Sequence, residues 1–487
     1  MKKRITIDPI TRLEGHGKIE IFLNDEGDVE NTYFQIPELR GFEKFCEGRP
    51  VEEVARIVPR ICGVCPVAHH LAAAKALDGV YSVDPPRTAK MLRELMYSAQ
   101  YVHSHIAHFY ALAAPDFVLG PDAKPEERNI LGVVGKVGLE KGGEVIKHRA
   151  YAQKVQGIIG SKPTHPITGI PGGQSKGITA EERDEILKMG ESCVEFAKFS
   201  LDLFEEIVLK NKTYLDIITG DIYKINTYYM GLVDENNKAN FYEGKIRVVD
   251  QEGTEVAKFE PNQYLDYIEE RVEPWTYLKI PYLKSVGWNG FTDGKDSGIY
   301  QVAPLGRANV IDGMATPLAQ EAYEKMISTL GGKKPITASL VHHWARLVEM
   351  LYAAERWVEL ASDEEIISDN FRTIPTATPN EGVGVVEAPR GTLIHHYKAD
   401  EAGLATKINL IVGTTNNYGA INLSVKRAAE KLIKKGKVDQ GLLNMVEMAF
   451  RAYDPCFSCA THSITGNIPL EVEVYESSGK LCQKLVK

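Results

Sequence analysis

Apolar residues recur every three to four positions over several long stretches of the chain, which is the spacing of one buried helix face. Pro66 suits the first turn of one of these helices. The pattern predicts further long helices over 86–113, 140–159, 180–210, 315–331, 337–362, 424–434 and 438–452, and a short one over 50–58. We therefore expect a bundle of long helices as the main body of the fold.

Alternating apolar and polar residues indicate strands in two other regions. Residues 4–36 predict a β-hairpin, with one strand over 18–23 and a polar turn at 24–27. Residues 211–300 combine Tyr, Val and Ile with polar turn clusters, which favours a β-rich insertion. Residues 163–177 are rich in Gly and Pro and predict an ordered loop. The predicted fold class is α+β, mainly α, with α/β pieces beside the helices.

Composition and charge narrow the possible functions. The chain has 487 residues, a formal net charge of −9 and no long basic block, so we expect no nucleic acid partner. No apolar run approaches the ~18 residues that cross a bilayer. The basic N-terminus lacks the apolar segment of a secretory signal. These features predict a cytoplasmic protein with no membrane span.

Four of the seven cysteines form two Cys-x-x-Cys pairs, Cys62 with Cys65 and Cys456 with Cys459. Two thiolates with two residues between them can hold one soft metal ion, and four thiolates make a complete sulfur site. The pairs lie near opposite ends of the chain, which excludes a local zinc knuckle. From spacing alone, a buried structural zinc, a redox-active metal and disulfides all remain open.

Other candidate residues have weaker signals around them. Three cysteines have no surrounding motif, and we expect ordinary thiols at Cys46, Cys193 and Cys482. The helix predicted over 86–113 carries three histidines, which we expect to belong to a packed or partner-facing helix and not to a metal site: His103, His105 and His108. Residues 385–391 predict a turn that contains an arginine.

Five blocks of residues resemble, in the same order, the large catalytic subunit of nickel–iron hydrogenases. Two are the cysteine motifs, Arg-x-Cys-Gly-x-Cys-x-x-x-His at 60–69 and Asp-Pro-Cys-x-x-Cys-x-x-His at 454–462. The others are Asp-Pro-Ile-Thr-Arg-Leu-Glu-Gly-His at 8–16, Arg-Gly-Phe-Glu at 40–43 and Glu-Ala-Pro-Arg-Gly at 387–391. The resemblance covers most of the chain and implies the large-subunit fold of that family.

The ending Cys-Phe-Ser-Cys-Ala-Thr-His and the stretch Glu-Gly-Arg-Pro at 47–50 are most similar to the cytoplasmic branch of the family. Members of that branch couple hydrogen to NAD(P), F420, methyl viologen or a heterodisulfide reductase.

The resemblance implies how the cysteines share a nickel–iron centre. Cys62 and Cys456 are expected to be terminal ligands of nickel. Cys65 and Cys459 are expected to bridge nickel to an iron that carries carbonyl and cyanide ligands. His69, four residues after Cys65, is expected to donate a hydrogen bond to a cluster sulfur and not to bind metal.

The resemblance also assigns residues around that centre. Glu14 is implied as the first proton carrier. Pro389 and Arg390 are implied to line the cofactor, with the guanidinium facing the open coordination position. Thr414 falls in a stretch that resembles the segment bonded to an iron-bound cyanide, although Gly413 stands where many relatives have proline.

A second metal and a processing site are implied near the C-terminus. Glu43 and His462 are expected to hold Mg²⁺, or Fe²⁺, close to the centre; a carboxylate with waters suits magnesium, which keeps much of its hydration. In the family, a protease cuts after the histidine of this motif once nickel is inserted. Residues 463–487 are therefore a cleavable extension or a retained tail, and the alternation over 470–475 predicts a strand within them.

The implied activity is reversible heterolytic cleavage of H₂ to protons and electrons at the nickel–iron centre. A terminal thiolate, Cys456, takes the proton and passes it to Glu14, while Arg390 supplies a fixed positive charge. The cysteines outside the two pairs are too few for an iron–sulfur chain, so a partner iron–sulfur small subunit is required. Electrons then reach a soluble acceptor: NAD(P), ferredoxin, F420 or a heterodisulfide reductase.

The resemblance implies further partners and one domain. The partners are diaphorase-like or heterodisulfide-reductase-like electron-transfer subunits, a maturation protease and nickel-insertion proteins. The expected parts of the single domain are a β-rich N-terminal part at 1–62, a helical part at 63–210, the β-rich insertion at 211–300, a helical part with the metal site at 301–462, and the extension at 463–487.

Two alternatives stay open at this point. One is a structural four-thiolate zinc subunit, and the other is an unprocessed, inactive precursor. The intact cysteines argue against a quinone-handling relative from respiratory complex I, which has lost the thiolates.

Overall fold

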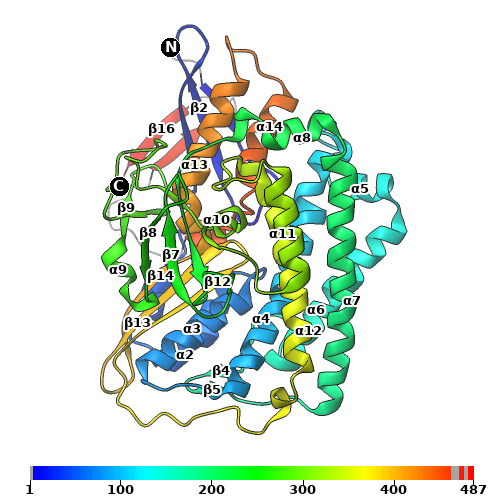
Figure 1. Cartoon of the computed structure of the whole chain (residues 1–487). Helices are drawn as coiled ribbons and strands as arrows, with labels where there is room; N and C mark the ends of the chain where they lie inside the picture. The colour runs from blue at the N-terminus through cyan, green and yellow to red at the C-terminus, as the bar shows by residue number, and fades with distance from the viewer. Residues whose placement is uncertain (1–3, 462–470, 476–480, 487) are drawn as a thin grey trace.

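The computed structural model describes residues 4–461, 471–475 and 481–486. Long helices form its larger part and stand side by side (Figure 1). Helix α12 (His342–Ser362) packs against α4 (Arg87–Ala107) and α7 (Ala180–Phe204), and α4 also packs against α6 (Leu139–Gly160). Nearly all of α12 is buried. The predicted helical bundle, in an α+β fold, is therefore confirmed.

The remaining helices are shorter or lie around this bundle. They are α1 (Phe42–Cys46), α2 (Val51–Ile57), α3 (Pro66–Val80), α5 (Ile130–Val137), α8 (Lys212–Thr219), α9 (Tyr264–Tyr267), α10 (Pro304–Val310), α11 (Pro317–Thr329), α13 (Gly413–Leu432), α14 (Gln440–Arg451) and α15 (Phe457–Ala460). Beyond α4 the chain continues in two π-helical segments, His108–Ala113 and Pro115–Leu119, where the sequence predicted an unbroken helix to residue 113.

Helix α13 begins at Gly413, well before the predicted start at 424. Its first turns are rich in Gly, Thr and Asn, residues of low helix propensity that obscure the start. Their polar side chains are used in buried contacts: Asn416 Nδ2 donates to Thr392 O at 2.7 Å, and Asn417 Nδ2 donates to Arg390 O at 2.8 Å. Tertiary contacts therefore override local propensity here.

Sheets lie in both regions where the sequence predicted strands. Strands β1 (Arg4–Ile7), β2 (Lys18–Leu23) and β3 (Val29–Gln35) form an antiparallel sheet, and β2 and β3 are the expected hairpin. In the β-rich insertion, the first sheet contains β11 (Tyr300–Gln301), β6 (Tyr228–Val233), β7 (Lys245–Val249) and β8 (Glu255–Phe259), and the second pairs β9 (Ile268–Val272) with β10 (Lys279–Leu283). The loop at 163–177 includes the short pair β4 (Gly169–Ile170) and β5 (Gly173–Gln174).

A further sheet was not predicted, apart from the turn at 385–391. Strands β12 (Glu381–Ala388), β13 (Gly391–Ala399) and β14 (Ala405–Ile411) run antiparallel, and β12 lies directly on α3. Gly382 and Gly384 allow this contact, because a Cβ on either would come within 2.1 Å of an α3 carbonyl oxygen. The sheet thus holds the β12–β13 turn above the start of α3.

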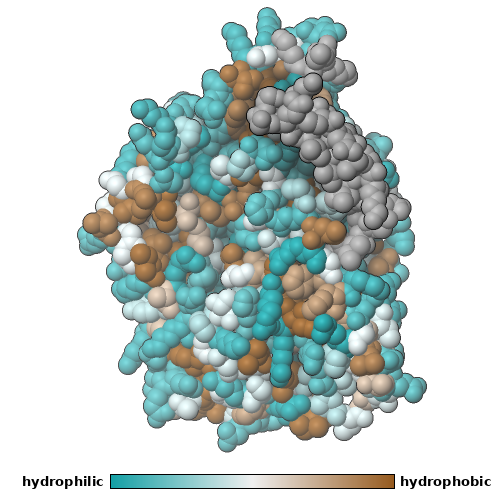
Figure 2. All heavy atoms as spheres, turned by 180° about the vertical axis from the view of Figure 1, so that it is seen from behind, coloured by the Kyte–Doolittle hydropathy of each residue, from teal (hydrophilic) through white to brown (hydrophobic). Residues whose placement is uncertain are grey.

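The surface and the C-terminal tail complete the description. The face in Figure 2 is largely hydrophilic, with scattered hydrophobic side chains. Within the described ranges, none of the helices has the length and apolar character needed to cross a membrane. The predicted strand at 470–475 is confirmed as β15 (Glu471–Tyr475), which pairs with β16 (Leu481–Val486).

Candidate metal centre

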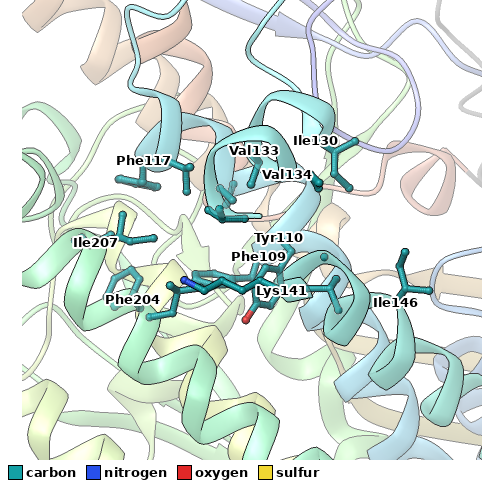
Figure 3. Close-up of a pocket in the computed structure, with 18 of the residues that line it drawn as sticks. Phe109, Tyr110, Phe117, Ile130, Val133, Val134, Lys141, Ile146, Phe204 and Ile207 are labelled. Carbon is teal, nitrogen blue, oxygen red and sulfur yellow. The ribbon is translucent and has the colours of Figure 1, made fainter. Parts of the chain in front are cut away.

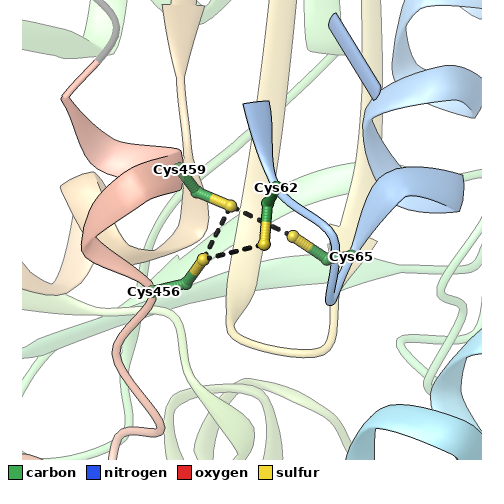
Figure 4. A group of neighbouring side chains, drawn as sticks. All are labelled: Cys62, Cys65, Cys456 and Cys459. Carbon is green, nitrogen blue, oxygen red and sulfur yellow. Dashed lines mark hydrogen bonds between the residues drawn. The ribbon is translucent and has the colours of Figure 1, made fainter. Parts of the chain in front are cut away.

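The four paired cysteines meet in one buried cluster, with their sulfurs pointing toward one another (Figure 4). All four Sγ atoms lie within 4.8 Å of one another. Sγ of Cys62 is 3.3 Å from Sγ of Cys456, and Sγ of Cys65 is 3.1 Å from Sγ of Cys459. These separations exceed the sulfur–sulfur bond length of a disulfide, and all four residues are free cysteines. The predicted gathering of both pairs is confirmed, and the disulfide alternative is wrong.

Local structure explains how each pair presents two sulfurs. Cys65 caps the N-terminus of α3, and Cys456 caps the N-terminus of α15, which carries Cys459. Hydrogen bonds from the other three thiols lower the pKa of Cys62 well below its ordinary value, whereas burial raises that of Cys456. The thiols of the cluster therefore differ in how readily they ionise, and Cys62 loses its proton more readily than Cys456.

Glu14, which the resemblance implied as the first proton carrier, lies against the cluster. The Cys456 thiol donates to Glu14 Oε2 over 2.9 Å, and Ser458 N donates to the same oxygen over 3.2 Å. The backbone of the N-terminal segment pairs with the C-terminal motif through Phe457 N and Glu14 O, at 3.0 Å. Gly15 permits this approach because its φ is +88° and a Cβ there would lie 2.9 Å from Ser458 N.

Arg390 occupies the β12–β13 turn and points into the buried site. Its Nε donates to Asp454 O at 2.7 Å, and its Nη2 lies 3.0 Å from Asp454 Oδ2. Burial alone would lower the pKa of Arg390, but Asp454 and the cluster cysteines reverse this and raise it well above its ordinary value. The guanidinium is therefore a permanent buried cation beside the sulfurs.

Arg307 holds the same turn through Pro389, whose carbonyl accepts from Arg307 Nη2 at 3.1 Å. Arg307 also pairs with Glu349 at 2.6 Å and with Glu387 at 3.0 Å. These contacts fix the turn residue Pro389, and with it the direction of Arg390.

Thr414 lies at the start of α13, where its Oγ1 accepts from Cys456 N at 2.9 Å. The hydroxyl therefore positions the cysteine that is nearest Glu14. A Cβ on Gly413 would lie 2.8 Å from Gly391 N, so the glycine lets α13 approach the turn that carries Arg390.

Glu43 lies in the first turn of α1 and lines a polar cavity of about 700 Å³. Its Oε1 accepts from Leu410 N at 2.8 Å, and Lys279 Nζ lies 3.7 Å away. Arg40 N donates to Thr461 O at 3.0 Å, which brings the C-terminal motif toward the segment of Glu43. His462, the other predicted magnesium ligand, lies outside the described residues.

His69 is buried in α3, one turn after Cys65. Its Nδ1 lies 3.2 Å from Nε2 of His395, whose Nδ1 lies 2.6 Å from the hydroxyl oxygen of Tyr397. His395 and Tyr397 alternate on β13, directly after the Glu-Ala-Pro-Arg-Gly block, but the sequence analysis did not identify them. A histidine two residues before a tyrosine in a buried strand was the signal that could have found them.

The other candidates have structural roles. His105 Nε2 lies 3.1 Å from Glu349 Oε2, and His108 Nε2 donates to Arg451 O at 2.9 Å, so both are packing histidines, as expected. His103 contacts Arg149 at 3.1 Å. Cys46 and Cys193 are buried thiols away from the cluster, and the side chain of Cys482 lies outside the described residues. In the described part of the chain, the four cysteines are the one group found that could hold a metal ion.

An apolar cavity of about 280 Å³ is separate from this centre (Figure 3). Its walls come from the π-helical segments and from α5, α6 and α7, and include Phe109, Tyr110, Val133 and Phe204. None of the cluster cysteines lines it.

Comparison with known proteins decides the family. The family model described as nickel-dependent hydrogenase matches residues 40–126 and 143–462, and one described as HoxL-like matches residues 4–39. The chain belongs to the nickel-dependent hydrogenase family. It is thus the large subunit of a hydrogenase, an oxidoreductase that oxidises or produces H₂.

Individual relatives support the same assignment. An iron-sulfur subunit of the F420-non-reducing hydrogenase from Archaeoglobus profundus is 50% identical over 484 residues, 99% of each chain. The NAD-reducing hydrogenase HoxS subunit beta of Cupriavidus necator is 38% identical over 497 residues, again 99% of each chain. The crystal structure of an NAD⁺-reducing NiFe-hydrogenase in the H₂-reduced state superposes with a TM-score of 0.88 and 37% identity, covering 94% of this hydrogenase subunit and 99% of that chain.

Proposed function

We propose that this subunit cleaves H₂ heterolytically at a nickel–iron centre held by the four clustered cysteines, and that Cys456 and Glu14 carry the proton away. The observation that carries the proposal is the direct 2.9 Å contact between the Cys456 sulfur and the Glu14 carboxylate, inside the cluster. A proton acceptor must lie within about 2.6–3.2 Å of the group it serves.

The donor set fits the proposed centre. Four soft thiolates suit nickel and iron, and all four Sγ atoms lie within 4.8 Å of one another, with Cys456 and Cys459 at 2.7 Å. Together these four cysteines would hold the two metals. When bound, such a centre supplies soft, electron-rich metals, with carbonyl and cyanide on iron, that polarise H₂ and take up its electrons.

Each neighbouring residue then has a distinct role. Arg390 keeps a positive charge beside the reacting position, and Asp454 orients it through two contacts. Thr414 holds the backbone of Cys456 in place and, with Pro389, lines the iron side. In the loaded centre His69 would donate a hydrogen bond to a cluster sulfur from Nε2; among the described residues the structure records its Nδ1 contact with His395 and no hydrogen bond to a sulfur.

A hard cation, Mg²⁺ or Fe²⁺, binds Glu43 in the polar cavity beside the centre. The carboxylate fits a hydrated cation, because the cavity leaves room for waters around it. His462 completes this site in the proposal.

Electrons leave through a partner. Cys46 and Cys193 are isolated buried thiols, so the described chain offers no second cysteine cluster that could hold iron and sulfide. An iron–sulfur small subunit therefore receives the electrons and passes them to further electron-transfer subunits in the cytoplasm. The relative from Archaeoglobus profundus is named F420-non-reducing, which favours NAD(P), ferredoxin or a heterodisulfide reductase over F420 as acceptor.

Maturation removes residues 463–487 after nickel-insertion proteins load the site, and a single domain of residues 1–462 remains. The intact mass of the subunit in the active complex tests this step: a chain ending at His462 supports it, and a chain ending at Lys487 contradicts it.

The decisive test is elemental analysis of the complex purified without air, combined with infrared spectroscopy of metal-bound carbonyl and cyanide. We expect nickel and iron together with bands from both ligands. Zinc alone, without these bands, would overturn the proposed centre and leave a structural thiolate site.

A further inference from the structure

We propose that Tyr397, acting through His395, fixes the ring proton of His69 on Nε2, and that both are positioning residues for the metal centre. All three side chains are fully buried. They form one continuous chain of contacts: Tyr397 Oη to His395 Nδ1 at 2.6 Å, then His395 Nε2 to His69 Nδ1 at 3.2 Å. Both distances are those of hydrogen bonds.

The direction of the first hydrogen bond follows from the tyrosine. A buried hydroxyl must give its proton to an acceptor, because an unpaired buried donor is costly. Within residues 4–461, the hydrogen bond recorded for the Tyr397 hydroxyl is the one to His395 Nδ1. Burial raises the pKa of Tyr397 well above its ordinary value, so the hydroxyl keeps its proton at every physiological pH. Tyr397 is therefore the donor and His395 Nδ1 the acceptor.

The remaining steps follow from imidazole chemistry. A neutral imidazole carries one proton, so His395 with an accepting Nδ1 carries its proton on Nε2. That Nε2–H donates to Nδ1 of His69, which makes this nitrogen an acceptor as well. His69 must then carry its own proton on Nε2. One hydroxyl thus sets the tautomers of two histidines in series.

The consequence for the cluster rests on the proposed function, in which His69 donates to a cluster sulfur. Since Nδ1 of His69 faces His395, that hydrogen bond must come from Nε2, and the tautomer set by Tyr397 is the one that can donate. A hydrogen bond withdraws electron density from a thiolate, and such bonds tune metal–sulfur centres. Without it, the metals become more electron-rich.

The test compares the wild-type complex with its Tyr397→Phe variant by infrared spectroscopy. We expect the carbonyl band to move to lower wavenumber in the variant, because a stronger sulfur donor increases back-donation from iron. Tyr323→Phe is the matched control: Tyr323 is also buried, and its hydroxyl donates to Ala308 O at 3.0 Å, outside the histidine chain. We expect its bands to coincide with those of the wild type.

A double variant tests whether Tyr397 acts through His395. Neutron diffraction of the wild-type complex tests the histidine tautomers directly. In a His395→Leu background, Tyr397→Phe should cause no further shift, because the relay is already broken. Neutron diffraction from crystals of the wild-type complex should locate a deuteron on Nε2 of both His69 and His395. A deuteron on Nδ1 of His69 would overturn the inference, even if the variant does not fold.

The outcomes separate this inference from the proposed function. If the wild type lacks carbonyl and cyanide bands, the proposed function fails. If the wild type has the bands and Tyr397→Phe leaves them in place, the proposed function stands and the positioning role of Tyr397 is wrong.

Discussion

Replacing Glu14 by Gln removes the proposed proton acceptor with little change in shape. The Cys456 sulfur lies 2.9 Å from Glu14 Oε2, within the range for direct proton transfer. A glutamine oxygen can still accept from Ser458 N, which is 3.2 Å away in the wild type. The amide cannot take up a proton near neutral pH. The substitution therefore removes the chemistry and keeps most of the contacts.

The expected loss is large for activity and small for stability. General acid–base groups contribute about 10²–10⁴-fold to rate, or roughly 3–5 kcal/mol of barrier. We expect hydrogen-dependent viologen reduction to fall by about that factor. Replacing a charged acceptor by a neutral one in this half-buried position should lower the free energy of unfolding by about 1 kcal/mol. Nickel content and infrared bands should match the wild type.

Two further variants complete this experiment. Glu14→Asp keeps the carboxyl group but withdraws it by about 1.5 Å, so its activity should lie between wild type and Glu14→Gln. Glu38→Gln is the matched control, because Glu38 pairs with the exposed His16 and has no contact with the cluster. If Glu14→Gln retains activity within about twofold of the wild type at full nickel content, Glu14 does not carry the proton.

Three more predictions follow from other parts of the chain. Cys65→Ala should abolish nickel binding and activity, whereas Cys46→Ala should keep both, because burial raises the pKa of Cys46 to about 11 and keeps it a thiol; nickel loss in Cys46→Ala would contradict the cluster assignment. Burial lowers the pKa of His70 to about 4, while its Nε2 accepts from Gly169 N at 2.8 Å, so the folded state needs the neutral ring. The unfolded chain takes up this proton near pH 6.5, and stability should therefore fall as pH drops from about 6.5 to 4, at up to about 1.4 kcal/mol per pH unit. Urea titrations should show a shallower pH dependence for His70→Gln, and an unchanged slope would refute the assignment. Arg307→Met removes the arginine that pairs with two buried carboxylates and should lower the free energy of unfolding by about 3–5 kcal/mol, measured by urea denaturation; a loss below about 1 kcal/mol would show that the pairs are dispensable.

Helical periodicity predicted the bundle well, because a long helix such as α7 buries one stripe of mainly apolar residues. It failed for the sheet of β12 to β14, since β12 and β13 are buried on both faces along most of their length and contain Gly384 and His395, so no clean alternation remains in them. It also placed the start of α13 too late, because Asn416 and Asn417 are held by the β12–β13 turn and not by local propensity.

The candidate site, like the fold, was predicted only in part. The Cys-x-x-Cys spacing predicted a sulfur site, and the resemblance placed Glu14 and Arg390 beside it. Neither could reveal that Asp454 holds Arg390, or that Tyr397 reaches His69 through His395, because these contacts join segments that are far apart in the sequence and meet only in the folded chain.

The cysteine cluster joins the two ends of the chain, and this has a consequence for the order of events during synthesis. Cys62 and Cys65 leave the ribosome early, but Cys456 and Cys459 follow only after most of the chain. At about 5–20 residues per second, the first pair waits roughly 20–80 s for the second. Closing a loop of roughly 400 residues costs about 5 kcal/mol of chain entropy, which the fold must supply before four thiolates can meet. In the proposed order of events, metal loading therefore follows synthesis of Cys459 and precedes removal of residues 463–487, and a chain that ends before Cys456 lacks two of the four cysteines of the cluster.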